Sequence, residues 1–355
     1  RYSERVGRVM AFGDGLYGGM FISAMYATAF FERDVARVVA GGLAAIPPRS
    51  GYARAIRDAL GAWRAHPRDW RAAWRAVNRS WDGRDACPEG ALTDFNIDAR
   101  LNGAYVALGL LYGGADFART LEITTRMGQD SDCNPSSAAG ILGVMLGYSR
   151  IPERYTAGIP AIADRKFAFT SYSLDEITRS TLARALRVIR RAGGQIADGE
   201  LRVPRQAPHR PRLEQWSMGA PTARIGVGDP RWQFVGSWTT QGNPETIWLG
   251  DLRRKVSKRG GNEAICTFEG TAVAVVGRAR PDGGRAELFL DGTPVATVDA
   301  YAPQDTNDID LWHTDGLQPG QHSLRIVTLD EANARSIGTR VELALVVQYA
   351  AEPTR

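Results

Sequence analysis

Apolar residues recur at helical spacing through the first half of the chain. Phe21, Met25 and Ala29 fall on one face of a helix, and the same spacing continues to about residue 191. Another such stripe is formed by Leu101, Ala104, Tyr105, Leu108 and Leu111. The last amphipathic run covers residues 174–190 and ends before Gly193-Gly194, a common helix terminator. The pattern predicts an all-α domain over residues 1–198.

The hydrophobic period changes from about 3.6 to 2 after residue 230. Short runs rich in β-branched and aromatic residues cover residues 271–276, 286–290, 295–298, 322–328 and 341–349. Asp291-Gly292 separates two of these runs and is a typical hairpin turn. Together they predict an antiparallel β-sandwich, specifically a jelly roll, over residues 231–350. Prolines and arginines alternate without a period between the two parts, which predicts a linker over residues 199–230.

The stretch at residues 128–143 reads GQDSDCNPSSAAGILG. Asn134 is a good N-cap and Pro135 suits the first helical position, so we expect a helix to begin there. Gly140 and Gly143 share a face of small residues. Since glycine costs up to about 1 kcal/mol inside a helix, this face predicts close approach by a neighbouring element.

Two aspartates, Asp130 and Asp132, precede this helix. Neighbouring carboxylates raise each other's pKa unless a cation or several hydrogen-bond donors neutralise them, and the helix dipole favours only one. Carboxylate oxygens are the ligands that Mg²⁺ or Mn²⁺ prefers. The alternative is that one aspartate caps the helix while the other faces water. The residues alone leave both interpretations open.

Composition is that of a globular protein, with 44% hydrophobic and 23% charged residues and a net charge of +5. No basic tract with interleaved aromatics argues for nucleic-acid binding. The three cysteines, Cys87, Cys133 and Cys266, lack the spacing of a zinc site or a disulfide framework. No apolar run is long enough to span a membrane. The chain begins at Arg1 rather than methionine, in a segment that resembles the inside of a domain, which is compatible with a removed targeting peptide and further missing residues.

Three stretches resemble the ADP-ribosylglycohydrolase family, an all-α fold with a two-metal site that hydrolyses the bond joining ADP-ribose to an acceptor. Residues 128–143 resemble the family's C-terminal metal motif. Gly13-Asp14-Gly15, ahead of Gly18-Gly19, is similar to its glycine-rich loop. Residues 102–117 resemble the helix that precedes the metal motif. The resemblance covers about the first 195 residues.

This resemblance implies that Asp130, Asp132 and Cys133 bind Mg²⁺ or Mn²⁺. Cys133 stands where the family has a threonine ligand, and a soft thiol suits Mg²⁺ poorly. The family's N-terminal Thr-Asp-Asp motif and early glutamate have no counterpart before Gly13. We therefore expect either a fragment without its first helices or a degenerate member, and a dinuclear site only if the N-terminal part is present. No catalytic residue can be named.

The resemblance also implies that Gly13, Asp14, Gly15 and Tyr17 line the sugar or phosphate side of the substrate site. A tight turn entering a helix is the alternative for this loop. Asp98 and Asn102, polar residues beside the apolar stripe, are predicted either to face that site or to face solvent. The candidate substrate-binding residues are therefore Gly13, Asp14, Gly15, Tyr17, Asp98 and Asn102.

The predicted sandwich resembles the galactose-binding-like jelly-roll modules of glycan-active enzymes. Trp248, Trp312 and His313 are candidates for stacking on a sugar, with a place in the sandwich core as the alternative. The two resemblances imply a metal-dependent hydrolase of an ADP-ribosyl, ribosyl or related glycosidic bond that acts outside the cytoplasm, secreted or periplasmic. The alternatives are a catalytically inactive protein that binds glycan through its sandwich, and a cytosolic ADP-ribosyl-protein hydrolase. The expected partner is a glycan or ribosyl-containing substrate, and the sequence does not set the oligomeric state.

Overall fold

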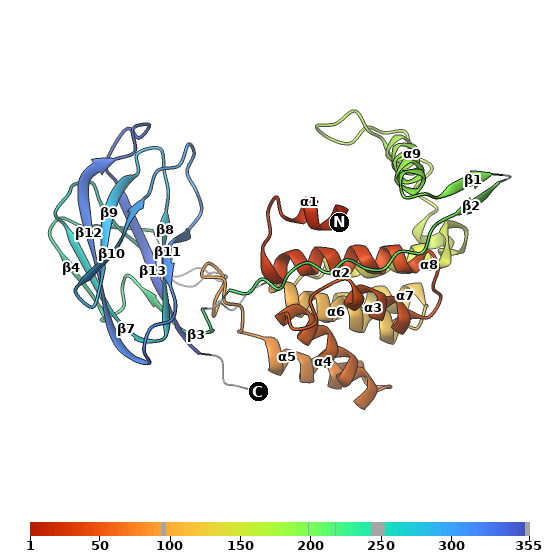
Figure 1. Ribbon diagram of the computed structural model, residues 1–355, viewed down its shortest axis with the longest axis horizontal. Coiled ribbons are helices and arrows are strands. Elements are labelled where there is room, and N and C mark those ends of the chain that lie inside the picture. Colours follow the sequence, from red (N-terminus) through yellow and green to blue (C-terminus); the bar gives the residue numbers. More distant parts are fainter. Residues whose placement is uncertain (94–96, 198, 217, 243–252, 352–355) are drawn as a thin grey trace. The chain divides into compact units, whose positions relative to one another are not determined.

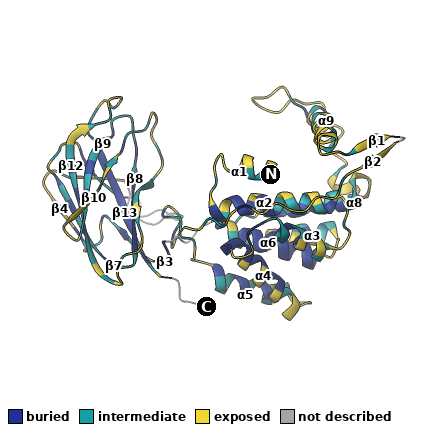
Figure 2. Ribbon diagram, in the orientation of Figure 1, coloured by how far each residue is buried: buried dark blue, intermediate teal, exposed yellow. Residues whose placement is uncertain are grey.

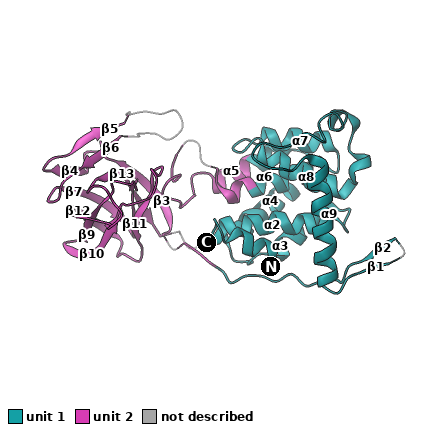
Figure 3. Ribbon diagram, turned by 90° about the horizontal axis from the view of Figure 1, so that it is seen from above, with its two compact units in different colours: residues 1–74, 103–213 teal, residues 75–102, 214–355 magenta. Residues whose placement is uncertain are grey.

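The computed structural model describes residues 1–93, 97–197, 199–216, 218–242 and 253–351. The chain divides into two compact units (Figure 3). Unit 1 comprises residues 1–74 and 103–213, and unit 2 comprises residues 75–102 and 214–355. The division falls within two helices, at residues 74 and 103.

Helices occupy the first half of the chain (Figure 1). They are α1 (Tyr2–Gly7), α2 (Gly13–Ala29), α3 (Val35–Ala44), α4 (Gly51–Ala65), α5 (Trp70–Trp81), α6 (Ala99–Gly113), α7 (Phe117–Arg126), α8 (Cys133–Leu146), η1 (Tyr148–Arg150), η2 (Glu153–Tyr155) and α9 (Leu174–Arg191). A small hairpin, β1 (Gln195–Ala197) with β2 (Glu200–Arg202), follows α9. The predicted all-α architecture of this part is confirmed.

Several helices begin where a short polar side chain accepts a backbone hydrogen bond. The side chains of Asp34, Ser50, Asp116 and Ser173 each accept from an N–H in the first turn of α3, α4, α7 and α9. At α9 the cap is reciprocal, because Glu176 also accepts from the backbone N–H of Ser173. Local sequence therefore fixes where these helices start.

The α6 helix is buried around almost its whole circumference, over residues 101–113 (Figure 2). In unit 1 its glycines permit close contacts with other helices. A methyl group at Gly103 would lie 1.9 Å from Oη of Tyr52, whose ring is itself fully buried. A methyl group at Gly109 would lie 1.9 Å from Oγ1 of Thr124 on α7. The predicted stripe is thus one side of a central helix, and the absence of a side chain at its glycines lets neighbouring side chains pack directly against its backbone.

Gly103→Ala is expected to destabilise the protein by about 1–3 kcal/mol, because the buried Tyr52 ring has no room to move. Gly61→Ala on α4 is the matched control: Gly61 is exposed and a methyl group there meets nothing within 4 Å. This control should gain up to about 1 kcal/mol from helix propensity. Urea denaturation of both variants measures the difference. Equal stability of the two variants would contradict the packing argument.

Unit 2 contains the strands β3 (Ala220–Gly226), β4 (Trp232–Val235), β5 (Thr239–Gln241), β6 (Arg254–Ser257), β7 (Glu263–Gly270), β8 (Ala272–Arg278), β9 (Gly284–Leu290), β10 (Thr293–Asp299), β11 (Ile309–Thr314), β12 (Gly320–Ala332) and β13 (Val341–Ala350). One sheet has the order β10-β9-β12-β7-β4, and the other has the order β11-β8-β13-β6-β5, with β3 also paired to β13. All of these pairs are antiparallel. The predicted antiparallel sandwich is confirmed.

The core of the sandwich lies between the two sheets. Phe268 and Leu324 from one sheet pack in the same cluster as Val275 and Val346 from the other. Strand β3 is a correction to the predicted linker over residues 199–230, because residues 220–226 pair with β13 and Ile225 is fully buried in this cluster. Pro221, which lacks a backbone N–H, obscured the strand pattern there.

The predicted Asp291-Gly292 turn joins β9 to β10, and both residues have positive φ, 49° and 81°. Asp291 also accepts hydrogen bonds from the neighbouring strand. Its Oδ1 accepts from Ser323 N at 2.9 Å, and its Oδ2 lies 2.7 Å from Nδ1 of His322, whose Nε2 lies 2.9 Å from the Gln318 carbonyl oxygen. Both ring nitrogens face acceptors, which favours the doubly protonated imidazolium.

The stability that His322 contributes is therefore expected to depend on pH. Burial lowers the pKa of His322, but the Asp291 carboxylate and the backbone carbonyls raise it by more. The pKa of His322 is higher in the folded than in the unfolded state. The stabilisation by His322 is therefore fully present below about pH 6.5 and is lost as the pH rises through the folded pKa. The gap in Tm between wild type and His322→Gln should be larger at about pH 5.5 than at about pH 8.5. A gap that is constant with pH would contradict the charged pairing.

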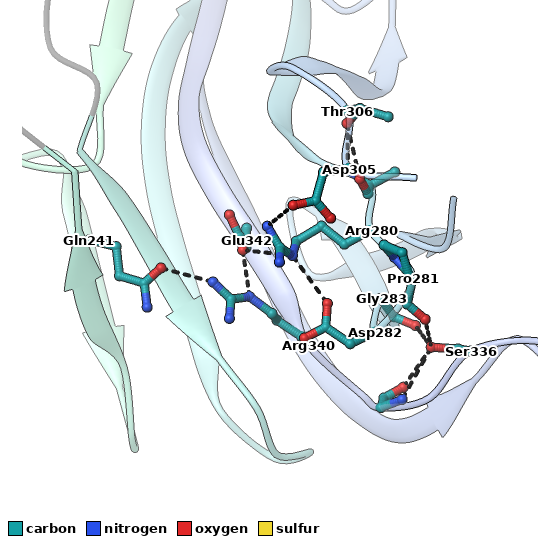
Figure 4. Close-up of polar contacts among 12 residues, drawn as sticks. Gln241, Arg280, Pro281, Asp282, Gly283, Asp305, Thr306, Ser336, Arg340 and Glu342 are labelled. Atoms are coloured by element: carbon teal, nitrogen blue, oxygen red, sulfur yellow. Dashed lines mark hydrogen bonds and ion pairs between the residues drawn. The ribbon is translucent and has the colours of Figure 1, made fainter. Parts of the chain in front are cut away.

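A buried ion cluster lies in unit 2 around Glu342, on β13 (Figure 4). Oε1 of Glu342 accepts from Nε of Arg340 at 2.5 Å and lies 3.5 Å from Nε of Arg280. Arg280 also pairs with Asp282 at 3.1 Å and with Asp305 at 2.9 Å. The Glu342 side chain is only 3% exposed, so its charge is neutralised almost entirely by the two arginines.

Candidate functional site

The Asp-Ser-Asp loop of unit 1 joins α7 to α8 through a left-handed turn, with φ of 84° at Gly128 and 54° at Gln129. The predicted N-cap at Asn134 is wrong, because α8 already begins at Cys133. The first turn starts early because Oδ1 of Asp130 accepts a hydrogen bond from the Cys133 backbone N–H at 2.9 Å. Asp130 therefore caps this helix start while Asp132 is exposed, which agrees with the predicted alternative for the two aspartates.

Asp130, Asp132 and Cys133 come together at this helix start. One ligand atom from each lies within 4.8 Å of the other two, and no other group of three His, Cys, Asp or Glu in the described part of the chain is arranged in this way. Asp132 and Cys133 are exposed and Asp130 is half-buried. A cation bound here would be open to solvent and to a substrate.

The electrostatics differ between the carboxylate and the thiol. Burial raises the pKa of Asp130, but hydrogen bonds, first from the Cys133 backbone N–H, lower it by more, and the carboxyl is held ionised. The hydrogen bond of Cys133 to Asp130, and then the negative charges of Asp130 and Asp132, raise the pKa of the Cys133 thiol. The donor set therefore fits a hard cation on two carboxylates better than it fits a soft metal on a thiolate.

The predicted glycine-rich loop forms the first turn of α2 in unit 1. Oδ1 of Asp14 accepts a hydrogen bond from the Tyr52 backbone N–H at 2.8 Å, at the start of α4. Tyr17 is fully buried and its hydroxyl donates to the Arg212 carbonyl oxygen at 2.9 Å. Gly13 is buried, whereas Gly15 is exposed. Asp14 and Tyr17 thus hold parts of unit 1 together, and ligand contact by these four residues stays a prediction.

Asp98 and Asn102 lie at the start of α6 in unit 2, and neither faces solvent as one of the two alternatives had it. They are 6% and 7% exposed. Asp98 forms a two-oxygen pair with Arg100, with the closest contact at 2.8 Å, and accepts from the Arg100 backbone N–H at 2.7 Å. The Asn102 side chain donates to the Asp98 carbonyl oxygen at 2.9 Å. Asp98 caps this helix and the Asn102 side chain is bonded to it, and substrate contact by both residues stays a prediction.

Of the three sugar-stacking candidates, Trp248 lies outside the described residues. Trp312 packs against the core between the sheets, which agrees with the predicted alternative of a place in the sandwich core. His313 is exposed, and its ring lies 5.1 Å from that of Trp216. Sequence reasoning missed Trp216 because it stands alone in a stretch without periodicity. An isolated tryptophan among prolines and arginines was the signal that could have found it.

Comparison with curated proteins finds two relatives from Flavonifractor plautii. An A type blood alpha-D-galactosamine galactosaminidase is 31% identical over 104 residues, which are 29% of this chain and 9% of that protein. An A type blood N-acetyl-alpha-D-galactosamine deacetylase is 30% identical over 143 residues, which are 40% of this chain and 17% of that protein. The chain thus spans only a small part of the length of the curated relatives it matches.

Solved structures with partial similarity include a two-domain esterase active on acetylated mannans, with 14% identity, a TM-score of 0.28 and coverage of 49% of this chain and 46% of that one. A family two carbohydrate esterase from Cellvibrio japonicus is 18% identical, with a TM-score of 0.26 and coverage of 37% and 36%. The profile of the ADP-ribosylglycohydrolase family matches residues 1–193, more than half of the chain. This chain therefore belongs to the ADP-ribosylglycohydrolase family.

Proposed function

We propose that this chain is a metal-dependent hydrolase of a glycosidic bond, in which Asp130 and Asp132 hold an Mg²⁺ or Mn²⁺ ion. The observation that carries the proposal is the gathering of Asp130, Asp132 and Cys133 at the start of α8. It supports the metal role that the sequence resemblance implied. When bound, the cation would polarise sugar hydroxyls and acidify a water near the anomeric carbon.

The chain's own residues have separate tasks in this proposal. The two carboxylates at the helix start supply negative charge, which favours a cation and also an oxocarbenium-like transition state. Asp130 is fixed by the Cys133 backbone N–H, so its carboxylate is oriented before any ligand binds. Asp132 and Cys133 are exposed, which leaves room for a substrate.

The proposed substrate class is a glycan or a ribosyl-containing compound. Family membership favours an ADP-ribosyl bond. The relatives that act on alpha-linked galactosamine and its N-acetyl form favour amino-sugar glycans. A glycan substrate also agrees with the proposal that the protein acts outside the cytoplasm. Among the described residues, no helix combines the length and apolar character needed to cross a bilayer.

Hydrolysis by the full chain tests this proposal. We expect Mn²⁺ to support release of sugar from N-acetyl-α-galactosaminides or from ADP-ribosyl substrates, EDTA to abolish it, and added Mn²⁺ to restore it. Asp132→Asn should reduce turnover by about 100-fold or more, as expected for loss of a group that acts on the reacting centre. Asp164→Asn, an exposed aspartate of unit 1, is the control and should leave turnover unchanged. Turnover that persists in EDTA would refute the proposed metal dependence.

A second candidate function is a catalytically inactive glycan-binding protein. The observation that favours it is the cap at α8, because a carboxylate that accepts from the Cys133 backbone N–H has a structural role without a metal. This candidate predicts glycan binding without turnover under any of the metal conditions above.

A further inference from the structure

Strand β11 of unit 2 contains an irregularity where it pairs with β8. Asp310 lies opposite Val276, Trp312 lies opposite Val275, and His313 lies opposite Ala274, so the register shifts between Asp310 and Trp312. One extra residue in a strand re-aims the side chains that follow it. Without the shift, Asp310 and His313 would point to opposite faces of the sheet, since they are three residues apart.

The shift places Asp310 and His313 on one face. Residues directly opposite each other share a face, and Val276 and Ala274, two apart on β8, belong to the cluster on the outer side of this sheet. Trp312 falls on the inner side, in the core between the sheets. Oδ2 of Asp310 lies 2.5 Å from Nδ1 of His313. With Nδ1 engaged, Nε2 of His313 is the ring nitrogen left for a ligand, and the side chain is 48% exposed.

An aromatic ring and a carboxylate adjoin this pair. The Trp216 ring lies 5.1 Å from the His313 ring at 53° and is 41% exposed. Oε1 of Glu89 accepts from the Asp310 backbone N–H at 3.2 Å, and its Oε2 lies 2.7 Å from Sγ of Cys87. Glu89 and Trp216 come from different segments of unit 2, and both meet β11 at the bulge.

Packing alone does not account for Asp310. Its Oδ1 is buried and has no hydrogen-bond partner among the described residues, which is unfavourable for a polar atom. Burial raises the pKa of the carboxyl by more than the neighbouring His313 ring lowers it, and the Glu89 charge also raises it. A carboxyl with one buried, unpaired oxygen, in contact with an exposed histidine, is typical of a functional site.

We propose that Trp216, His313 and Glu89 form a subsite that binds one sugar ring of a glycan on the outer face of this sheet, with Asp310 as a positioning residue for His313. The Trp216 ring offers an apolar surface to the C–H face of a pyranose. The His313 ring can donate or accept a hydrogen bond with a hydroxyl of the sugar, and the Glu89 carboxylate can accept one. The carboxylates disfavour nucleic acid and other polyanions.

The inference that the ligand is a carbohydrate rests on the proposed function, whereas the subsite is located from the geometry of unit 2. The Asp-Ser-Asp loop lies in unit 1, so the two proposals can fail separately. Loss of hydrolysis with sugar binding intact would leave the subsite standing. Hydrolysis without any role for Trp216 in binding would leave the proposed function standing.

The test is binding of the full chain to an array of neutral and amino-sugar glycans, followed by calorimetry with the best-bound glycan. We expect Trp216→Ala to weaken binding about tenfold or more, equivalent to about 1.4 kcal/mol, and Trp216→Phe to stay within about threefold of wild type. His313→Gln should also weaken binding. Val295→Ala, a half-exposed residue on β10 of the other sheet, is the control and should bind as wild type.

Two results would overturn the subsite: no binding to any glycan on the array, or equal binding by wild type, Trp216→Ala and His313→Gln. The Trp216→Phe variant guards against loss of fold in the alanine variant. The positioning role of Asp310 has its own readout in the ¹⁵N shifts of the His313 ring. Asp310→Ala removes the partner of Nδ1, so the ¹⁵N shifts of the His313 ring should change. Unchanged shifts would refute the positioning role.

Discussion

Glu342→Gln is expected to lower the free energy of unfolding of the sandwich by about 3–5 kcal/mol, the range for removing one partner from a buried ion pair. The amide keeps the volume of the carboxylate but removes its charge. Arg340, whose side chain is 12% exposed, would then lose its carboxylate partner, whereas Arg280 would keep Asp282 and Asp305 (Figure 4). Arg340 would be a largely buried cation without a carboxylate partner, and water cannot reach it well enough to compensate.

Urea denaturation of the full chain, monitored by tryptophan fluorescence, measures this loss in the free energy of unfolding. Glu331→Gln is the matched control, because Glu331 is an exposed glutamate on β12 and should change stability by no more than about 0.5 kcal/mol. A loss below about 1 kcal/mol for Glu342→Gln would mean that solvent screens the cluster as it does a surface pair.

The fold class could be predicted from the sequence because both periodicities are strong where side chains are buried. The stripe on α6, the continuous apolar runs of β8 and β13 and the alternating runs of β9 and β12 are of this kind. The predicted runs did not include β3, β4, β5, β6, β7 or β11. For β3 and β11 the sequence shows a physical reason. Pro221 and Arg224 interrupt the pattern of β3, and the bulge in β11 breaks the alternation on which strand recognition depends.

The candidate sites were predictable to different degrees. Asp130, Asp132 and Cys133 are neighbours in the sequence, so their gathering needs only a loop and a helix start. The helix start was misplaced at Asn134, whereas the alternative in which one aspartate caps the helix agrees with the hydrogen bond from the Cys133 backbone N–H to Asp130. Trp216, Glu89 and Asp310 lie far apart along the chain, and only the tertiary fold of unit 2 brings them together.

Asp130→Asn is expected to lower Mn²⁺ affinity by at least about tenfold, whereas Cys133→Thr should keep or strengthen it. The two changes separate the two possible roles of the loop. Asparagine still accepts from the Cys133 backbone N–H, so the cap and the helix remain while the negative charge is lost. Threonine replaces a thiol whose pKa is raised by its hydrogen bond to Asp130 with a hydroxyl oxygen that a hard cation accepts more readily.

Calorimetric titration of Mn²⁺ into the full chain and both variants measures these affinities, with circular dichroism as the check on helix content. Asp164→Asn again serves as the charge-matched control. Equal Mn²⁺ affinity of wild type and Asp130→Asn would refute metal binding at the loop. Loss of helix content in Asp130→Asn would mean that the Asp130 carboxylate has a structural role in starting α8. A weaker Cys133→Thr site would mean that the thiol is a ligand after all, and the cation would then be a softer one than Mg²⁺, since sulfur ligation selects against hard ions.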